Sequence, residues 1–289
     1  LGDSSQGDYR ILLVGDSRLI PSDQHTYRDG LAYSLVQNGD ASMLNQVSSA
    51  SRDAQVFIEP LLDAVASGTT GRVGRLMAPL GIRYIVIPVI DRVHSSSESP
   101  VAVPLGLREA FAEQLDLQNV YGPSSMTIFE NSQWIPLTGM LSAVASQQSS
   151  EGGAEALVAT ELTGSLAALN GTTSWASPTQ ELPAGRFHMG VPFDPRWTLT
   201  INGQTIKPQA SFGTVMHFET GDGGLARLSY SNPLRRYMWE LLQVFLWLVV
   251  VLGILQPNFR RRSRRQQFEL PETTPVVSLS ANAISGDSA

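Results

Sequence analysis

Short apolar runs mark the first strands of the chain. Tyr9–Gly15 and Ile82–Val89 are almost entirely apolar, and each ends near a turn residue, Gly15 or Pro88. A run of this kind is typical of a strand that is covered on both faces. Ser125–Glu130 alternates between polar and apolar residues, which predicts a further strand.

Apolar residues at helical spacing separate these strands. Two segments, one ended by Gly68 and the other by Gly81, carry apolar residues at intervals of three and four. These residues are Phe57, Leu61, Leu62 and Val65 in the first segment, and Val73, Leu76, Met77 and Leu80 in the second. Leu107, Phe111 and Leu115 predict a third helix at about 105–117. Because strands alternate with helices, we expect a small α/β domain over residues 8–136.

The pattern changes after residue 136. Residues 141–155 are small and polar with little periodicity, and we expect a linker over residues 137–160. Over residues 161–232, short strand-like runs are separated by turn residues, which predicts an antiparallel, sandwich-like β-domain. Asn202-Gly203 lies between two of these runs and is the clearest hairpin signal in the chain.

The longest apolar stretch is Tyr237–Leu255, in which Glu240 and Gln243 are the strongly polar residues. Its length suits a helix that crosses a hydrocarbon core of ~30 Å. The predicted fold class is therefore α+β: a small α/β domain, then an antiparallel β-sandwich-like domain, then one C-terminal transmembrane helix at 237–255. Residues 256–289 form a basic tail that we expect to be disordered after Pro271.

A cluster of arginines gives this span a direction. Arg260, Arg261, Arg262, Arg264 and Arg265 follow the apolar stretch, whereas Arg235 and Arg236 precede it. The positive-inside rule then places the tail in the cytoplasm and the bulk of the chain outside the plasma membrane. We expect the cluster to contact anionic lipid head groups.

Composition narrows the classes of partner and site. The chain has 289 residues, a formal net charge of −6 and no cysteine. This argues against nucleic acid as a partner and excludes disulfides and thiolate metal sites. Because the chain begins at Leu1 without a signal sequence, we expect an upstream transmembrane region of the same protein. The sequence predicts no cofactor, metal or catalytic residue in this fragment.

Two short motifs could indicate a hydrolase. Gly15-Asp16-Ser17 follows a predicted strand and resembles the first block of the GDSL hydrolases, and Asp91-x-x-His94 resembles their acid–base block. A serine nucleophile also needs oxyanion donors, and the asparagine block that supplies one in that family is missing. Asp91 and His94 also come much earlier in the chain than in that family. A GDSL-like hydrolase is therefore the second alternative, and we expect Ser17 not to be a nucleophile.

Other motifs resemble a family of membrane proteins. The chain carries FDPRWTLTING at Phe193–Gly203, then Phe212, then GGLARLSY at Gly223–Tyr230, directly before the predicted span. It also carries Gly15-Asp16 with Arg18, GIRYIVIP at Gly81–Pro88 and IFENSQWIP at Ile128–Pro136. With these motifs it resembles the C-terminal region of YfhO-like bacterial membrane proteins, whose large actinobacterial members are similar to GT-C glycosyltransferases.

The resemblance implies a role in the cell envelope. It implies the last part of a multi-spanning glycosyltransferase-type protein that uses polyprenyl-phosphate sugars to build envelope glycan, with its catalytic carboxylate upstream of this fragment. The part seen here would be a scaffold or would bind the acceptor glycan. The alternative is a non-catalytic, membrane-anchored protein that binds carbohydrate or another protein. Further upstream spans would favour the transferase, and a lone signal peptide would favour the binding protein.

Trp197 is the candidate glycan-binding residue. An exposed indole on a sheet can stack on a sugar ring. However, Trp197 alternates in register with Leu199 and Ile201, which share its face of the predicted strand. This alternation favours a tryptophan that packs in the core.

Overall fold

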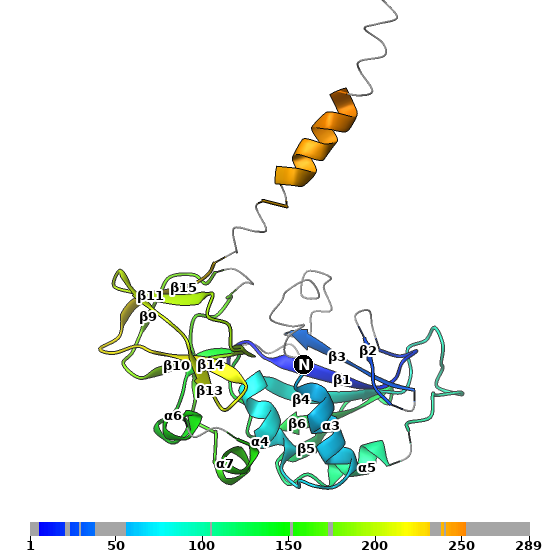
Figure 1. Ribbon diagram of the computed structural model, residues 1–289. Coiled ribbons are helices and arrows are strands. Elements are labelled where there is room, and N and C mark those ends of the chain that lie inside the picture. The colour runs from blue at the N-terminus through cyan, green and yellow to red at the C-terminus, as the bar shows by residue number, and fades with distance from the viewer. Residues whose placement is uncertain are drawn as a thin grey trace, which may run out of the picture. The chain divides into compact units, whose positions relative to one another are not determined.

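The structure is a computed structural model, and it describes residues 6–20, 24–28, 30–37, 56–104, 106–150, 153–172, 176–231, 238–239 and 241–252 (Figure 1). The contacts divide the chain into two units, Leu1–Ser231 and Asn232–Ala289. The fold of the first unit is mixed α+β with several antiparallel sheets, which confirms the coarse fold class.

The first sheet of unit 1 has the strand order β2-β3-β1-β4-β6-β5. Its strands are β1 (Arg10–Asp16), β2 (His25–Thr26), β3 (Leu31–Gln37), β4 (Ile82–Pro88), β5 (Leu117–Val120) and β6 (Met126–Asn131). β1 and β4 are parallel neighbours, and the other pairs are antiparallel. The sequence pattern predicted β1, β4 and β6 but not β2, β3 or β5, and the sheet they form is mostly antiparallel.

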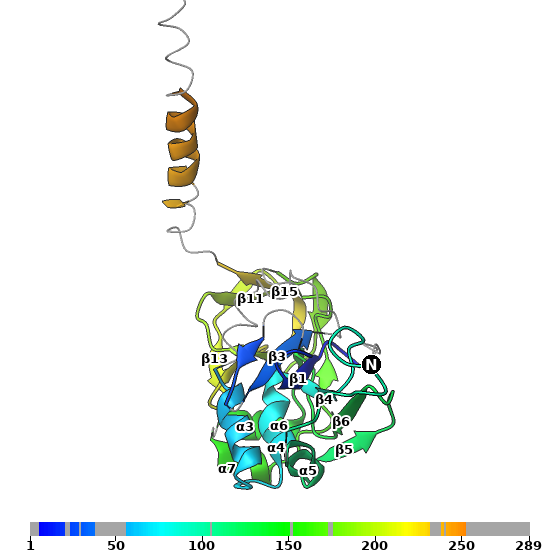
Figure 2. The ribbon, with the colours of Figure 1, turned by 90° about the vertical axis from the view of Figure 1, so that its right-hand side faces the viewer.

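Helices cover one face of this sheet (Figure 2). They are α3 (Ile58–Ala66), α4 (Val73–Met77), the 3₁₀ helix η1 (Ala78–Leu80) and α5 (Leu107–Ala112). Leu12 and Val14 of β1 pack in the core on the helical side, whereas Ile11 and Leu13 belong to a cluster on the opposite face. This is the alternation expected of a strand that is covered on both faces. Gly81 ends η1 in the left-handed region, with φ 70°.

The third predicted helix is shorter than expected. The prediction covered 105–117, but α5 ends at Ala112, and Leu115 is 77% exposed. The residues after α5 instead cap the N-terminus of α4: Val73 N donates to Gln114 Oε1 at 3.0 Å, and Arg75 N donates to Asp116 Oδ2 at 2.8 Å. The free N–H groups of α4 thus find acceptors on these residues, which leave the helix to reach them.

The linker predicted over 137–160 is wrong as a description of this segment. It contains β7 (Thr138–Met140), α6 (Ala143–Ser149) and α7 (Ala154–Ala159). Ser142 caps α6 by accepting a hydrogen bond from Ala145 N at 3.3 Å. Leu141, Ala145 and Leu157 are buried in the same core as β1 and β4. The small residues that suggest a linker instead fit short helices into a crowded core.

Two antiparallel sheets form the rest of unit 1. Their orders are β13-β14-β10-β7-β8 and β12-β11-β15-β9. The strands not yet named are β8 (Leu166–Ala167), β9 (Gln180–Leu182), β10 (Arg186–Pro192), β11 (Trp197–Ile201), β12 (Gln204–Ile206), β13 (Gln209–Ser211), β14 (Val215–Glu219) and β15 (Gly224–Tyr230). A second core joins residues of both sheets, among them Phe187, Met216, Leu199 and Leu228. This arrangement agrees with the predicted sandwich-like β-domain.

The hairpin at Asn202-Gly203 is confirmed. β11 pairs with β12 so that Ile201 lies opposite Gln204, which leaves two residues in the loop. Both have positive φ, 49° at Asn202 and 83° at Gly203. These are the angles of a type I′ turn, whose twist matches that of the paired strands.

Buried polar contacts connect the first sheet with the β-rich part. Arg10 donates from Nη1 to Leu80 O at 2.6 Å and to Gly190 O at 2.5 Å. His188 Nε2 lies 3.1 Å from Pro79 O. The regions expected as separate domains, 8–136 and 161–232, lie within one compact unit as far as Ser231.

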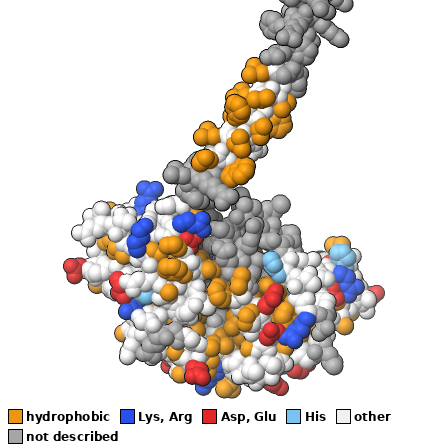
Figure 3. All heavy atoms as spheres, viewed as in Figure 1, with side chains coloured by type: hydrophobic (Ala, Val, Ile, Leu, Met, Phe, Trp, Pro, Cys, Tyr) orange, Lys and Arg blue, Asp and Glu red, His pale blue; other side chains and the backbone are white. Residues whose placement is uncertain are grey.

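The predicted span Tyr237–Leu255 lies partly outside the described residues. Met238–Trp239 and Leu241–Leu252 are helical, and the described side chains are exposed and mostly apolar (Figure 3). Within the described part of the chain, no helix is both long and apolar enough to cross a membrane. The arginines at 260–265 and the rest of the tail, 256–289, lie outside the described residues.

Candidate functional site

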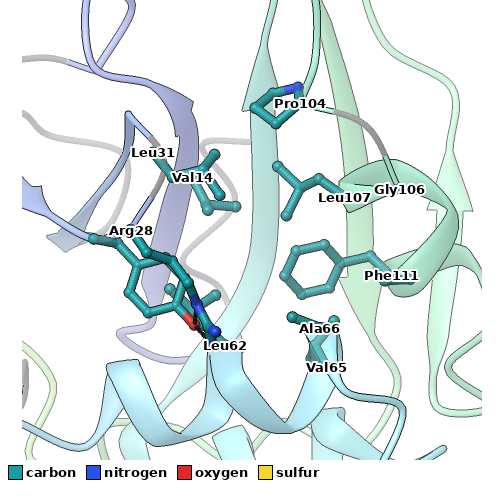
Figure 4. Close-up of a pocket in the computed structure, with 12 residues that line it drawn as sticks. Val14, Arg28, Leu31, Leu62, Val65, Ala66, Pro104, Gly106, Leu107 and Phe111 are labelled. Carbon is teal, nitrogen blue, oxygen red and sulfur yellow. Dashed lines mark hydrogen bonds between the residues drawn. The ribbon is translucent and has the colours of Figure 1, made fainter.

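A cleft of about 520 Å³ opens between the first sheet and the helices α3 and α5 (Figure 4). It is lined by Val14, Tyr27, Arg28, Leu31, Leu62, Val65, Ala66, Pro104, Gly106, Leu107, Ala110 and Phe111. Its volume lies in the ~300–1,000 Å³ range of small-molecule sites. Most of its lining side chains are apolar, and its polar side chains, Tyr27 and Arg28, lie together.

Helical spacing builds two walls of the cleft. Leu62, Val65 and Ala66 are three and four residues apart on α3, so they share one face. Leu107, Ala110 and Phe111 repeat this spacing on α5. Figure 4 shows the labelled side chains of the two helices on different sides of the same space.

Gly106 begins the α5 wall without a side chain. Its φ is 81°, a value that favours glycine. A Cβ placed at this position would meet no heavy atom within 4 Å. The open space in front of Gly106 fits its position on the lining of the cleft.

At the polar edge of the cleft, the lining residues Tyr27 and Arg28 form a cluster with Asp63 of α3, which bonds to both but is not itself on the lining. Tyr27 Oη and Arg28 Nη2 both donate to Asp63 Oδ1. Arg28 Nε also donates to Tyr27 Oη at 2.8 Å, and its guanidinium lies 4.9 Å from the centroid of the Tyr27 ring. The Arg28 and Asp63 side chains are 54% and 55% exposed, so water and ligands can reach this polar cluster.

The chemistry of this lining favours noncovalent binding. An apolar interior removes the apolar surface of a ligand from water, and a few converging polar groups fix its orientation. In the described residues, no group of three or more His, Cys, Asp or Glu side chains could hold a metal ion. The apolar lining and its polar edge are the features of a ligand-binding cleft.

Asp91 and His94 form a local pair after β4. His94 Nδ1 lies 2.7 Å from Asp91 Oδ2, and Asp91 Oδ1 accepts from the backbone N–H groups of Val93 and His94. Desolvation acts to raise the pKa of Asp91. The hydrogen bonds from His94 and the backbone outweigh it and hold the pKa far below its ordinary value.

Ser17 lies at the same edge of the sheet as this pair, because β1 and β4 are parallel neighbours. Asp16 is bound locally: Arg18 donates to its two oxygens at 2.9 and 2.8 Å. The side-chain bond from Arg18 lowers the pKa of Asp16. In the described part of the chain, no hydrogen bond joins Ser17 to Asp91 or His94. The three residues of the hydrolase motifs thus share an edge without the contacts of a triad.

Trp197 packs in the core, as its alternation predicts. It is 3% exposed, and its ring centroid lies 4.9 Å from that of Tyr230. Leu199 and Ile201 are buried on the same face of β11. A tryptophan that stacks on a sugar must expose a ring face, so this burial argues against the candidate glycan-binding role of Trp197.

Two buried histidines lie opposite each other on β10 and β14. His188 and His217 are directly paired, and each is 1% exposed. Burial lowers the pKa of His188 to about 3, and the bond to Pro79 O only partly opposes this shift. Burial and Arg186 also lower the pKa of His217. Both side chains are therefore neutral near pH 7.

The sequence pattern did not reveal the cleft. Leu62 and Val65 carry the periodic signal of a core helix, and the pattern does not show whether the space opposite them is filled. Arg28 and Asp63 are 35 positions apart, with no motif to link them. Comparisons of the chain with protein-family models, curated proteins and solved structures found no match.

Proposed function

We propose that this chain is the C-terminal extracytoplasmic region and last span of a multi-spanning membrane protein that assembles envelope glycan from lipid-linked sugars. The observation that carries the membrane location is the helix Leu241–Leu252, whose side chains are apolar apart from Gln243 and exposed to solvent. Such a surface is costly in water and is favourable in a bilayer. The arginines at 260–265 support a cytoplasmic tail.

Within that protein, unit 1 acts by binding and positioning. Its cleft is apolar with a compact polar edge, which suits recognition of a ligand. The resemblance to YfhO-like and GT-C proteins supports a catalytic carboxylate upstream of this fragment. In this proposal the transferase chemistry takes place in the upstream region, and unit 1 braces the membrane domain or holds the acceptor glycan.

The second candidate is a non-catalytic, membrane-anchored binding protein. It is favoured by the cleft itself, because every residue that lines it belongs to unit 1. Binding in this cleft would need no other domain. The two candidates differ in what happens to lipid-linked sugars when unit 1 is removed.

Topology is tested with the full chain in spheroplasts. External protease should digest the region 1–231 and spare a tag placed after Ala289. Val249→Arg puts a charge near the middle of the span, which costs about 2.5–3.5 kcal/mol of insertion free energy, and should reduce membrane insertion. Val249→Leu is the matched control and should insert normally. Digestion of the tag with protection of unit 1 would overturn the topology.

The glycan role is tested by deleting residues 6–231 from the native protein in its own cells. We expect polyprenyl-phosphate sugars to accumulate and the envelope glycan to decrease, since the acceptor is no longer held. Unchanged lipid-linked sugars with normal membrane insertion of the remaining protein would rule out the transferase proposal and favour the anchored binding protein.

A further inference from the structure

We propose that the cleft between α3 and α5 binds an uncharged amphipathic small molecule. Its apolar ring or chain would fill the space between the helices, and a hydroxyl or amide group would meet the cluster of Tyr27, Arg28 and Asp63. This inference rests on the proposed role of unit 1 as a binding module, and it adds the chemical class of the ligand.

The apolar body follows from the side chains that line the cleft. The side chains that face the space from β1, α3 and α5 include Val14, Leu62, Val65, Leu107 and Phe111, none of which can hydrogen-bond. A polar or charged group placed among them would lose its bonds to water without replacement. Apolar surface, by contrast, is stabilised there by ~25 cal/mol per Å².

The uncharged head group follows from the charges at the edge. The Arg28 guanidinium and the Asp63 carboxylate form an ion pair, so each already has its counter-charge. A ligand carboxylate would be attracted by Arg28 and repelled by Asp63, and a ligand ammonium would meet the reverse, so neither gains a net attraction that offsets its loss of water. An uncharged group meets neither repulsion.

The same cluster leaves a donor and an acceptor for the ligand. The bonds to Asp63 from Tyr27 and Arg28 both end on Oδ1, and those from Arg28 use Nε and Nη2. Asp63 Oδ2 and Arg28 Nη1 take part in none of them. A hydroxyl or a primary amide can donate to such an oxygen and accept from such an N–H group.

The test uses the full chain in lipid nanodiscs and three photoreactive probes. The probes share one diazirine-bearing alkyl chain and differ in the head group: a hydroxyl, a carboxylate or an amine. Labelled peptides are mapped by mass spectrometry. Labelling of Leu241–Leu252 serves as an internal standard for the amount of probe in the bilayer.

We expect the hydroxyl probe to label α3 and α5 about ten-fold more than either charged probe, a ratio that corresponds to ~1.4 kcal/mol. Equal labelling by the three probes, or labelling of Leu241–Leu252 alone, would overturn the ligand class. Loss of labelling at Leu241–Leu252 with labelled α3 and α5 would instead contradict the membrane location and leave the cleft site standing.

Two variants and one control variant test the site further. Ala66→Trp fills the cleft from an exposed position on α3 and should abolish labelling of α5. Ala112→Trp is its control on α5, exposed and outside the cleft lining, and should label like the native chain. Asp63→Asn leaves Arg28 without its counter-charge and should shift the preference toward the carboxylate probe. An unchanged preference in Asp63→Asn would contradict the charge argument.

Discussion

Mild acid should destabilise unit 1 through His188. The ring is 1% exposed, and its Nε2 lies 3.1 Å from Pro79 O. In the described part of the chain its Nδ1 has no hydrogen-bond partner. Arg10 and His217 both act against its protonation. A proton on His188 would therefore place a second buried positive charge near Arg10.

The sign and size of the effect follow from the two pKa values. His188 has a pKa of about 3 in the folded chain, whereas a histidine in an unfolded chain has a pKa of about 6.5. Well above a pH of about 6.5, His188 is neutral in both the folded and the unfolded state, so a change of pH does not affect stability through this residue. Below it the unfolded state binds the proton first, so stability falls by ~1.4 kcal/mol per pH unit until the folded pKa is reached.

From pH 7.5 to pH 5, His188 should thus remove about 2 kcal/mol from the free energy of unfolding. His217, whose pKa is also lowered by burial and Arg186, adds to this loss, while Glu219 opposes it. Asp16 and Asp91 have lowered pKa values as well. The stability that these two carboxylates contribute is lost mainly near pH 4 and below. The range from pH 7.5 to pH 5 therefore isolates the histidines.

The assay is urea unfolding of the full chain in mild detergent, followed by tryptophan fluorescence at several pH values between 7.5 and 5. His188→Gln keeps an N–H donor for Pro79 O and removes the titrating ring, so the loss of stability between pH 7.5 and pH 5 should shrink by about 2 kcal/mol. Thr138→Val changes another buried polar side chain on a neighbouring strand and should keep the native dependence.

Two results would refute this reasoning. If native stability were the same at pH 7.5 and pH 5, the histidines would not be held neutral by burial. If His188→Gln kept the full pH dependence, the loss would come from other groups. The comparison uses slopes against pH, so a cost of the substitution at pH 7.5 does not affect it.

Three further substitutions test the fold and the hydrolase motif. Trp197→Ala should lower the free energy of unfolding by ~3–5 kcal/mol in urea, and an unchanged midpoint would contradict its packing against Tyr230. Gly203→Ala should cost ~1 kcal/mol or more because φ is 83°, whereas Gly71→Ala, in open space and without positive φ, should have little effect. Ser17→Ala should leave any ester hydrolysis by the purified chain unchanged, and a loss of several orders of magnitude would identify a nucleophile.

Local signals predicted several elements of unit 1. The almost entirely apolar run Ile82–Val89 contains β4, and the alternation around Trp197 corresponds to β11 with its buried face. Asn202-Gly203 became a two-residue turn. In each case the residues that determine the structure lie next to each other in the chain. Their spacing and backbone preferences are therefore visible in the sequence.

Long-range contacts account for what was missed. The parallel neighbours β1 and β4 are separated in the chain by β2, β3, α3, α4 and η1 among the described elements, so their pairing has no local sequence signal. α5 is short because Gln114 and Asp116 cap α4, some 40 residues earlier. Ala145 is small and carries no periodic signal, yet it is fully buried. The residues that make these contacts lie far apart in the chain, so a local sequence pattern does not reveal them.

The cleft shows the same limit at the level of function. Leu62 and Val65 face the interior of unit 1 by their helical spacing, and they would do so whether that interior were filled or open. The difference is made by the opposite wall, where Gly106 has no side chain, and by Arg28 and Asp63, which pair across the edge. Periodicity therefore predicts which surfaces turn inward, and the space between two such surfaces decides whether they form a core or a binding site.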